Sequence, residues 1–162
     1  EGLVIWYLMD CCGQDEAEAV VSYRKYLTLE AAKDIFVLTY DRMRRYEGTW
    51  HTEKKLLFPS YVFLDSENRR VLLKELGESR RLLCIRQAEE GFLRDLYGDS
   101  RHLKMSKGIV KNGFPKVTEG PLKGLEQRIC RIDRHKRIAK LMMPAEQNIG
   151  YITAGLEITE KI

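Results

Sequence analysis

The stretch Val117–Arg137, V-T-E-G-P-L-K-G-L-E-Q-R-I-C-R-I-D-R-H-K-R, decides how the C-terminal third of the chain folds. Its Gly120-Pro121 step is typical of a turn, because proline holds φ near −65° and glycine permits the positive φ at which a chain reverses. After the turn we expect a short strand with apolar anchors at Ile129 and Ile132, followed by a hairpin tip at residues 133–137.

The same stretch is strongly basic. Six Lys or Arg residues and one acidic residue lie between Arg128 and Lys140. Residues 106–162 hold 11 basic and 6 acidic side chains, whereas residues 1–105 hold 17 and 18, so the net charge of +4 belongs to the C-terminal third. This density of cations on a short β ladder indicates a surface that meets phosphates. The alternative is a solvated surface whose charge serves only solubility.

Upstream of this stretch, apolar runs and helical periodicity alternate. Leu3–Met9 is continuously apolar and rich in β-branched and aromatic residues, which predicts a buried strand. Asp15 is a favourable N-cap, and apolar residues recur at helical spacing after it. The pattern further predicts strands at 35–40, 56–64 and 81–87, helices at 68–76 and 89–97, and a basic hairpin at 42–55 that turns at Glu47-Gly48. This order predicts the α+β class, with a mainly antiparallel N-terminal sheet flanked by helices.

The C-terminal third has a different pattern. Short strands separated by turns are predicted at 116–118, 128–133, 138–143 and 151–158, which is typical of a small β barrel. Residues 101–114 are charged, contain glycine and have poor periodicity. We therefore expect an N-terminal domain at 1–100, a linker at 101–114 and a barrel domain at 115–162.

These segments resemble the transcription factors of the NusG family. G-P-L-K-G-L-E at 120–126 with I-D-R-H-K-R at 132–137 resembles the KOW motif that ends those proteins. Trp6-Tyr7 in the first strand and F-P-S-Y at 58–61 resemble the NusG N-terminal (NGN) domain, in which the family form is F-P-G-Y, so Ser60 departs from it. M-S-K-G-I-V at 105–110 and A-G-L-E-I at 154–158 resemble the LoaP group, NusG paralogs that act as operon-specific antiterminators. The resemblance covers about residues 3–160.

The resemblance implies a contact with bacterial RNA polymerase. In the family, apolar and aromatic side chains around the F-P-x-Y segment receive the clamp helices of the β′ subunit. The matching residues here are Trp6, Tyr7, Phe58, Pro59 and Tyr61. The competing interpretation is that they belong to the sheet core, and we favour it for Trp6. The hairpin at 42–55 would lie near upstream or non-template DNA, although a solvated charged face explains it equally well.

For the C-terminal domain, the LoaP resemblance implies that the KOW barrel binds a hairpin in the nascent leader RNA. The residues expected to contact RNA are Lys123, Arg128, Arg131, Arg134, His135, Lys136, Arg137 and Lys140. The implied function is transcription antitermination and elongation control, with read-through of terminators in specific operons. Two alternatives stay open: a general NusG-type factor whose KOW domain binds a protein, and a free-standing RNA-binding protein.

No pattern in the sequence indicates an enzyme. His51, His102 and His135 lie in separate polar segments, and neither a nucleophile elbow nor a P-loop occurs. The four cysteines form no C-x-x-C pair, so we expect neither a metal nor a cofactor. No stretch reaches the ~18 apolar residues of a membrane helix. We expect a cytoplasmic monomer that does not bind a membrane.

Overall fold

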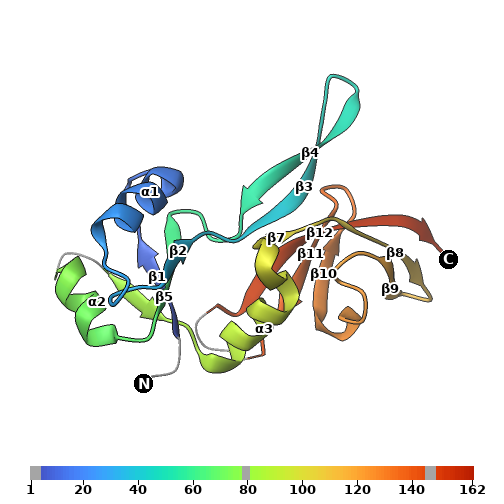
Figure 1. Ribbon diagram of the computed structural model, residues 1–162. Helices are drawn as coiled ribbons and strands as arrows, with labels where there is room; N and C mark the ends of the chain where they lie inside the picture. The colour runs from blue at the N-terminus through green and yellow to red at the C-terminus, as the bar shows by residue number, and fades with distance from the viewer. Residues whose placement is uncertain (1–4, 78–80, 145–148) are drawn as a thin grey trace. The chain divides into compact units, whose positions relative to one another are not determined.

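The computed structural model describes residues 5–77, 81–144 and 149–162 (Figure 1). The predicted α+β class is confirmed, with three α-helices and several sheets in this part of the chain. The chain divides into two compact units. The N-terminal unit comprises Glu1–Leu38 and Phe58–Gly91, and the C-terminal unit comprises Thr39–Leu57 and Phe92–Ile162. None of the described helices is long and apolar enough to cross a membrane.

The N-terminal unit is built on a four-stranded antiparallel sheet in the order β2-β5-β1-β6. Its strands are β1 (Ile5–Asp10), β2 (Asp34–Phe36), β5 (Tyr61–Ser66) and β6 (Leu82–Cys84). The helices α1 (Glu16–Tyr26) and α2 (Arg69–Leu76) pack on one face of this sheet through Ala19 and Leu72, which meet Tyr7, Met9 and Leu64 in a common core. The N-terminal sheet and its flanking helices therefore follow the predicted order.

The start of α1 and the end of α2 lie where local sequence predicts them. Asp15 caps α1 by accepting a hydrogen bond from the Glu18 N–H at 3.1 Å, and Asn68 caps α2 by accepting one from the Val71 N–H at 3.2 Å. Gly77 ends α2 with a φ of 78°. The helix α3 (Gln87–Tyr97) begins two residues before its predicted start at residue 89, and it is followed by a 3₁₀ turn at Gly98–Ser100.

The strand predicted at 56–64 is wrong at its start. The strand Thr49–Leu56 ends at the residue where the predicted strand begins, and β5 begins only at Tyr61. A turn lies between them, closed by a hydrogen bond from the Tyr61 N–H to the Phe58 carbonyl at 3.2 Å. Pro59 cannot donate to a β ladder, and Ser60 adopts a positive φ of 75° that no strand accommodates. Two successive residues unsuited to a ladder thus interrupt the apolar run.

The C-terminal unit contains a five-stranded sheet in the order β10-β11-β12-β8-β9. Its strands are β8 (Ser106–Lys111), β9 (Phe114–Glu119), β10 (Ile129–Asp133), β11 (Ile138–Met142) and β12 (Tyr151–Lys161). The β12–β8 pair is parallel and the other pairs are antiparallel. Within the described residues β9 and β10 remain the two edges of this sheet, so the strands do not form a closed barrel.

Residues 101–114, predicted as a linker, carry β7 (His102–Leu103) and β8. The buried positions of β8 include Ser106 and Gly108, which are too small to produce an apolar pattern. Gly108 is required there, because a Cβ atom would lie 2.6 Å from the Lys116 carbonyl oxygen of β9. A strand whose inward side chains are small cannot be recognised from an alternation of apolar and polar residues.

The basic hairpin predicted at 42–55 is confirmed. It consists of β3 (Thr39–Tyr46) and β4 (Thr49–Leu56), which Figure 1 shows as one long two-stranded ribbon. Glu47 and Gly48 have φ values of 53° and 80°, the left-handed pair that a tight two-residue hairpin turn requires. β3 also pairs in parallel with β7. The hairpin belongs to the C-terminal unit, whereas the expected boundary at residue 100 assigns it to the N-terminal domain.

Candidate nucleic-acid interface

The turn between β10 and β11 presents three cationic or titratable side chains to solvent. Arg134, His135 and Lys136, here called the cationic tip, are all exposed. Asp133 organises the turn, because its Oδ1 accepts a hydrogen bond from the Lys136 N–H at 2.9 Å. This hydrogen bond, together with the charge of Lys136, lowers the pKa of the Asp133 carboxyl from its ordinary value of 3.8. The single acid of the basic stretch therefore shapes the turn.

A second group of cations lies behind the tip, on the ladder. Arg131 of β10 is directly opposite Lys140 of β11. The two side chains line a hollow of about 180 Å³ together with Asp133, Lys136, Ile138 and Ala139. Like charges opposite each other in a ladder destabilise it, and a bound anion removes that penalty. The hollow is therefore suited to a phosphate.

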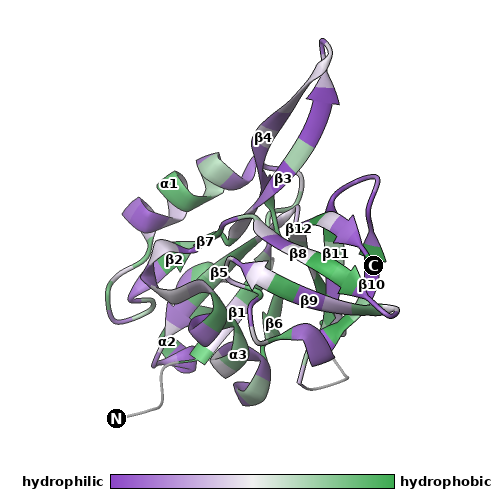
Figure 2. Ribbon diagram, turned by 90° about the vertical axis from the view of Figure 1, so that its right-hand side faces the viewer, coloured by the Kyte–Doolittle hydropathy of each residue, from purple (hydrophilic) through white to green (hydrophobic). Residues whose placement is uncertain are grey.

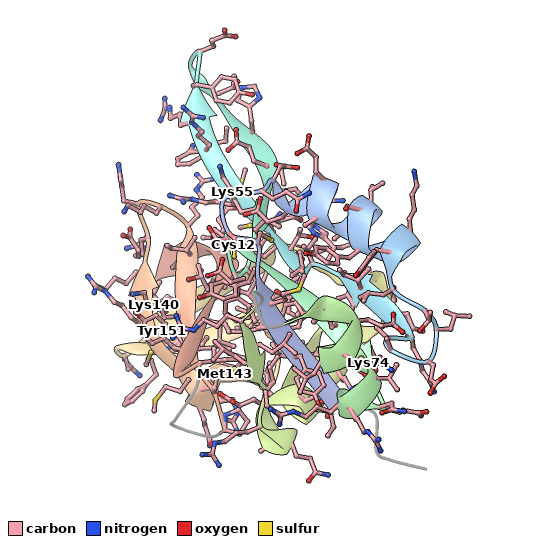
Figure 3. All side chains as sticks on the ribbon, turned by 90° about the vertical axis from the view of Figure 1, so that its left-hand side faces the viewer. Cys12, Lys55, Lys74, Lys140, Met143 and Tyr151 are labelled. Carbon is pink, nitrogen blue, oxygen red and sulfur yellow. The ribbon has the colours of Figure 1, made fainter. Side chains whose placement is uncertain are left out.

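Tyr151 of β12 extends this surface. The Lys140 ammonium nitrogen lies 4.4 Å from the centre of the Tyr151 ring and 3.4 Å from its hydroxyl oxygen. Figure 3 shows the two labelled side chains next to each other on neighbouring strands. Tyr151 is half exposed and places an aromatic ring beside the cations, which is the composition of surfaces that bind RNA. Sequence reasoning missed Tyr151, because it lies 11 residues from Lys140 and meets it only across the ladder.

Two of the predicted RNA contacts have other partners. The Arg137 guanidinium lies 3.8 Å above the Trp50 ring, 3.4 Å from Glu157, and donates to the Met43 sulfur at 3.5 Å. The Arg128 guanidinium lies 5.1 Å from the Phe92 ring centre and donates to the Met142 carbonyl at 3.3 Å. Lys123 is exposed, but it belongs to the separate turn that follows β9. The structure thus gathers Arg131, the cationic tip and Lys140 into one surface.

The hairpin β3–β4 has two different faces. Met43 and Trp50 lie on the face that Arg137 covers. The opposite face carries Tyr46 and His51, whose rings stack at 3.7 Å with an interplanar angle of 11°, and Arg44, whose guanidinium lies 5.7 Å from the Tyr46 ring. Figure 2 shows that the hairpin is mainly hydrophilic toward its turn. Aromatic and cationic side chains on an exposed ribbon suit contact with nucleic acid.

A network of polar groups attaches the base of this hairpin to the C-terminal strands. Asp41 Oδ1 lies 2.7 Å from His102 Nε2, and Asp41 Oδ2 accepts a hydrogen bond from the Met105 N–H at 3.1 Å. His102 Nδ1 lies 2.8 Å from the Thr39 hydroxyl. At Gly155 of β12, a Cβ atom would collide with the Asp41 carbonyl oxygen and the Met105 sulfur. The Thr39 hydroxyl, the His102 imidazole and the Asp41 carboxylate follow one another as the hydroxyl, imidazole and carboxylate of a hydrolase catalytic triad do. We assign them to attachment of the hairpin, because they join β3 to β7 and to the chain that leads into β8.

In the N-terminal unit, the residues expected to bind polymerase fall into two groups. Tyr7 is 2% exposed and faces the helices, where burial raises the pKa of its hydroxyl. Trp6 is 4% exposed and packs edge-on against Phe36 and Phe63, with ring centres 5.0 and 5.5 Å away. These two residues support the sheet from within.

The other three surround the turn before β5. Phe58 and Tyr61 are half-buried, and Pro59 is exposed. The Phe58 ring centre lies 5.8 Å from that of Phe63, so the aromatic cluster of the sheet continues to the surface at Phe58. The Ser60 N–H donates to Glu16 Oε2 at 2.6 Å, which ties the turn to α1. The accessible part of the expected polymerase contact is therefore Phe58, Pro59 and Tyr61.

The part of the chain that the structure describes contains no group of three or more His, Cys, Asp or Glu side chains placed to hold a metal ion. No family model matches the chain, and no curated protein matches its sequence.

Proposed function

We propose that this protein is a NusG-type transcription antitermination factor that joins RNA polymerase to a structured leader RNA. The observation that carries the proposal is the surface formed by Arg131, the cationic tip and Lys140. Arg131 and Lys140 lie opposite each other on the β10–β11 ladder, the cationic tip lies in the turn that joins the two strands, and Asp133 is engaged in shaping that turn. Cations grouped on one ladder and its turn can contact neighbouring phosphates of one RNA strand.

The N-terminal unit would contact the β′ clamp helices of polymerase through Phe58, Pro59 and Tyr61. Two observations support this role. The three residues lie at a turn that is anchored to α1, and aromatic side chains provide a large, stiff area of the kind found at the centres of interfaces. A KOW-type barrel is the fold that the sequence motif implies for the C-terminal strands. The described strands form a five-stranded sheet that is open between β9 and β10.

The two contacts would act by tethering. RNA that emerges from polymerase remains attached to it, so a protein bound to the leader is held at a high effective concentration near the clamp helices. Two contacts of moderate strength then give stable recruitment to transcripts that carry the leader, and much weaker recruitment to others.

The decisive experiment is terminator read-through by purified bacterial RNA polymerase on two templates, with and without the native leader upstream of the terminator. We expect read-through that depends on both the leader and the protein. Read-through on both templates would favour the general elongation factor, and read-through on neither, with RNA binding retained, would favour the free-standing RNA-binding protein. A variant with Arg131→Ala, Arg134→Ala and Lys136→Ala should lose leader-dependent read-through. The matched control, Arg70→Ala with Lys74→Ala, removes two exposed cations of α2 and should retain it.

A further inference from the structure

The two edge strands of the C-terminal sheet line a common groove. β10 contributes one wall of this groove, and the other comes from the turn before β9, the start of β9 and the ends of β8 and β12. Its volume is about 410 Å³, within the range of ~300–1,000 Å³ that is typical of sites for small ligands. Ten residues form its lining: Val110, Gly113, Phe114, Pro115, Ile129, Cys130, Arg131, Ile132, Arg134 and Lys161.

The lining combines an apolar floor with a cationic rim. Ile129, Ile132 and Pro115 are half-buried, whereas Phe114 exposes 75% of its surface. Arg131, Arg134 and Lys161 supply three positive charges, and none of the described residues that line the groove is acidic. A flat, exposed aromatic ring next to cations is the arrangement that receives a base and its phosphates. The groove is therefore complementary in charge and chemistry to a nucleotide.

We propose that this groove holds an unpaired nucleotide of the bound RNA, with its base against Phe114 and its flanking phosphates at Arg131, Arg134 and Lys161. The inference rests on the proposed function, because it assumes that the C-terminal unit binds RNA. Arg131 lines both this groove and the hollow beside Lys140. The backbone of one RNA strand can therefore pass from the hollow, where only phosphates are held, to the groove, where a base is held as well.

A polypeptide strand suits this groove less well than a nucleotide. A peptide that docks between two sheet edges forms ladder hydrogen bonds with one of them. Here Pro115 removes an N–H donor from β9, and a bulge between Ile129 and Arg131 interrupts the regular ladder of β10. Proline and bulges are features that protect edges from strand addition. Neither feature hinders stacking on Phe114.

The test compares two RNA probes with the protein: a blunt duplex, and the same duplex closed by a five-nucleotide loop. We expect the looped RNA to bind more tightly than the duplex. Phe114→Ala should weaken binding of the looped RNA roughly 5- to 150-fold, the effect of losing one stacked base, and should leave duplex binding unchanged. Phe114→Trp should retain the preference for the loop. Tyr26→Ala is the control, because Tyr26 is an exposed aromatic residue of α1, at 64% against 75% for Phe114.

A second readout uses the exposed thiol of Cys130, which lines the groove. In a Cys12→Ser, Cys84→Ser background, the looped RNA should slow alkylation of Cys130 by a maleimide, and the duplex should not. If both RNAs bind but Phe114→Ala affects neither, or both equally, the groove assignment is wrong and the proposed function stands. If a looped DNA binds as tightly as the looped RNA, the occupant is not specifically RNA. If wild-type protein binds neither of these RNAs but binds the native leader, the inference fails and the proposed function stands. If it binds none of the three RNAs, both fail.

Discussion

At the scale of single residues, several side chains have roles that their type alone does not reveal. Ser60 has a positive φ of 75°, a backbone conformation that glycine adopts without steric cost and serine does not. Arg134 and Arg137 are three positions apart in the same basic run. One is exposed, and the other is held between Trp50 and Glu157 with only 22% of its side chain accessible. Identity and charge are equal for these two arginines, and the environment decides what each does.

Ser60→Gly should stabilise the protein by about 1 kcal/mol, because a left-handed backbone costs a residue with a Cβ atom about 1–2 kcal/mol that glycine does not incur. The hydrogen bond from the residue 60 N–H to Glu16 remains possible in the variant. Urea denaturation measures the change. Ser60→Ala is the control and should give no increase, since alanine retains the strained φ. An equal gain in both variants would show that the serine hydroxyl, and not the backbone, is the cause.

Glu126 should make stability depend on pH. Its Oε2 accepts a hydrogen bond from the Val117 N–H at 3.0 Å, and this bond is the main reason why the pKa of Glu126 is lowered from 4.5 in the folded protein. A lowered folded-state pKa contributes stability that is complete above the unfolded-state pKa and is lost as the pH falls through the folded-state value.

We therefore expect the free energy of unfolding to fall as the pH drops below about 4.5, the ordinary pKa of this carboxyl, and to fall less steeply in Glu126→Gln. Glu119→Gln serves as the control, because Glu119 is an exposed carboxylate whose ion pair with Lys107 spans 3.8 Å. Parallel pH profiles for wild type and Glu126→Gln would contradict the role given to this carboxylate.

At the scale of elements, the attachment of the β3–β4 hairpin is the main feature of the C-terminal unit. β3 meets β7 through paired backbone and meets β12 where Gly155 leaves room for it. Arg137, from the turn of another hairpin, covers Met43 and Trp50 on one face of β3–β4. These contacts hold the hairpin through one of its faces. The opposite face, which carries Tyr46 and His51, does not take part in them.

Arg137→Ala should destabilise the protein by about 1–2 kcal/mol, because it removes a partly buried cation–π contact and leaves the Trp50 ring uncovered. RNA binding measured on the folded protein should change little. Arg134→Ala should do the opposite: stability stays the same, and the slope of log binding constant against log salt concentration flattens by roughly one unit for the lost phosphate contact. If Arg137→Ala flattens the salt slope and leaves stability intact, the assignments of the two residues are reversed.

At the scale of the whole molecule, function would require two surfaces on one chain. The N-terminal unit offers Phe58, Pro59 and Tyr61 around an anchored turn, and the C-terminal unit offers the cations of β10 and β11. Each surface is complete within its own compact unit. Tethering therefore requires no rearrangement inside either unit, and the two contacts can be removed separately.

Phe58→Ala should abolish leader-dependent read-through while leader RNA binding stays within about twofold of wild type, since the substitution removes an aromatic anchor of the proposed polymerase contact and leaves the cations of the C-terminal unit in place. Circular dichroism confirms that the variant is folded. Leu83→Ala, which truncates an exposed apolar residue of β6, is the matched control and should retain read-through. Undiminished read-through by the Phe58 variant would exclude this turn from the polymerase contact.

The sequence by itself determined the features that depend on neighbouring residues. The cap at Asp15, the hairpin turn at Glu47-Gly48 and the basic turn after β10 are all governed by local backbone chemistry, and each lies where the pattern predicts. The α+β class follows from the order of these elements.

Only the tertiary structure decided what depends on distant residues. It revealed β8, whose small inward side chains leave no apolar pattern, and it placed Arg137 on Met43, a residue 94 positions away. It also gathered Phe114, Arg131 and Lys161 around one groove. The physical reason is that a charge pattern gives the number of cations, whereas packing between strands far apart in the chain decides which of them remain at the surface.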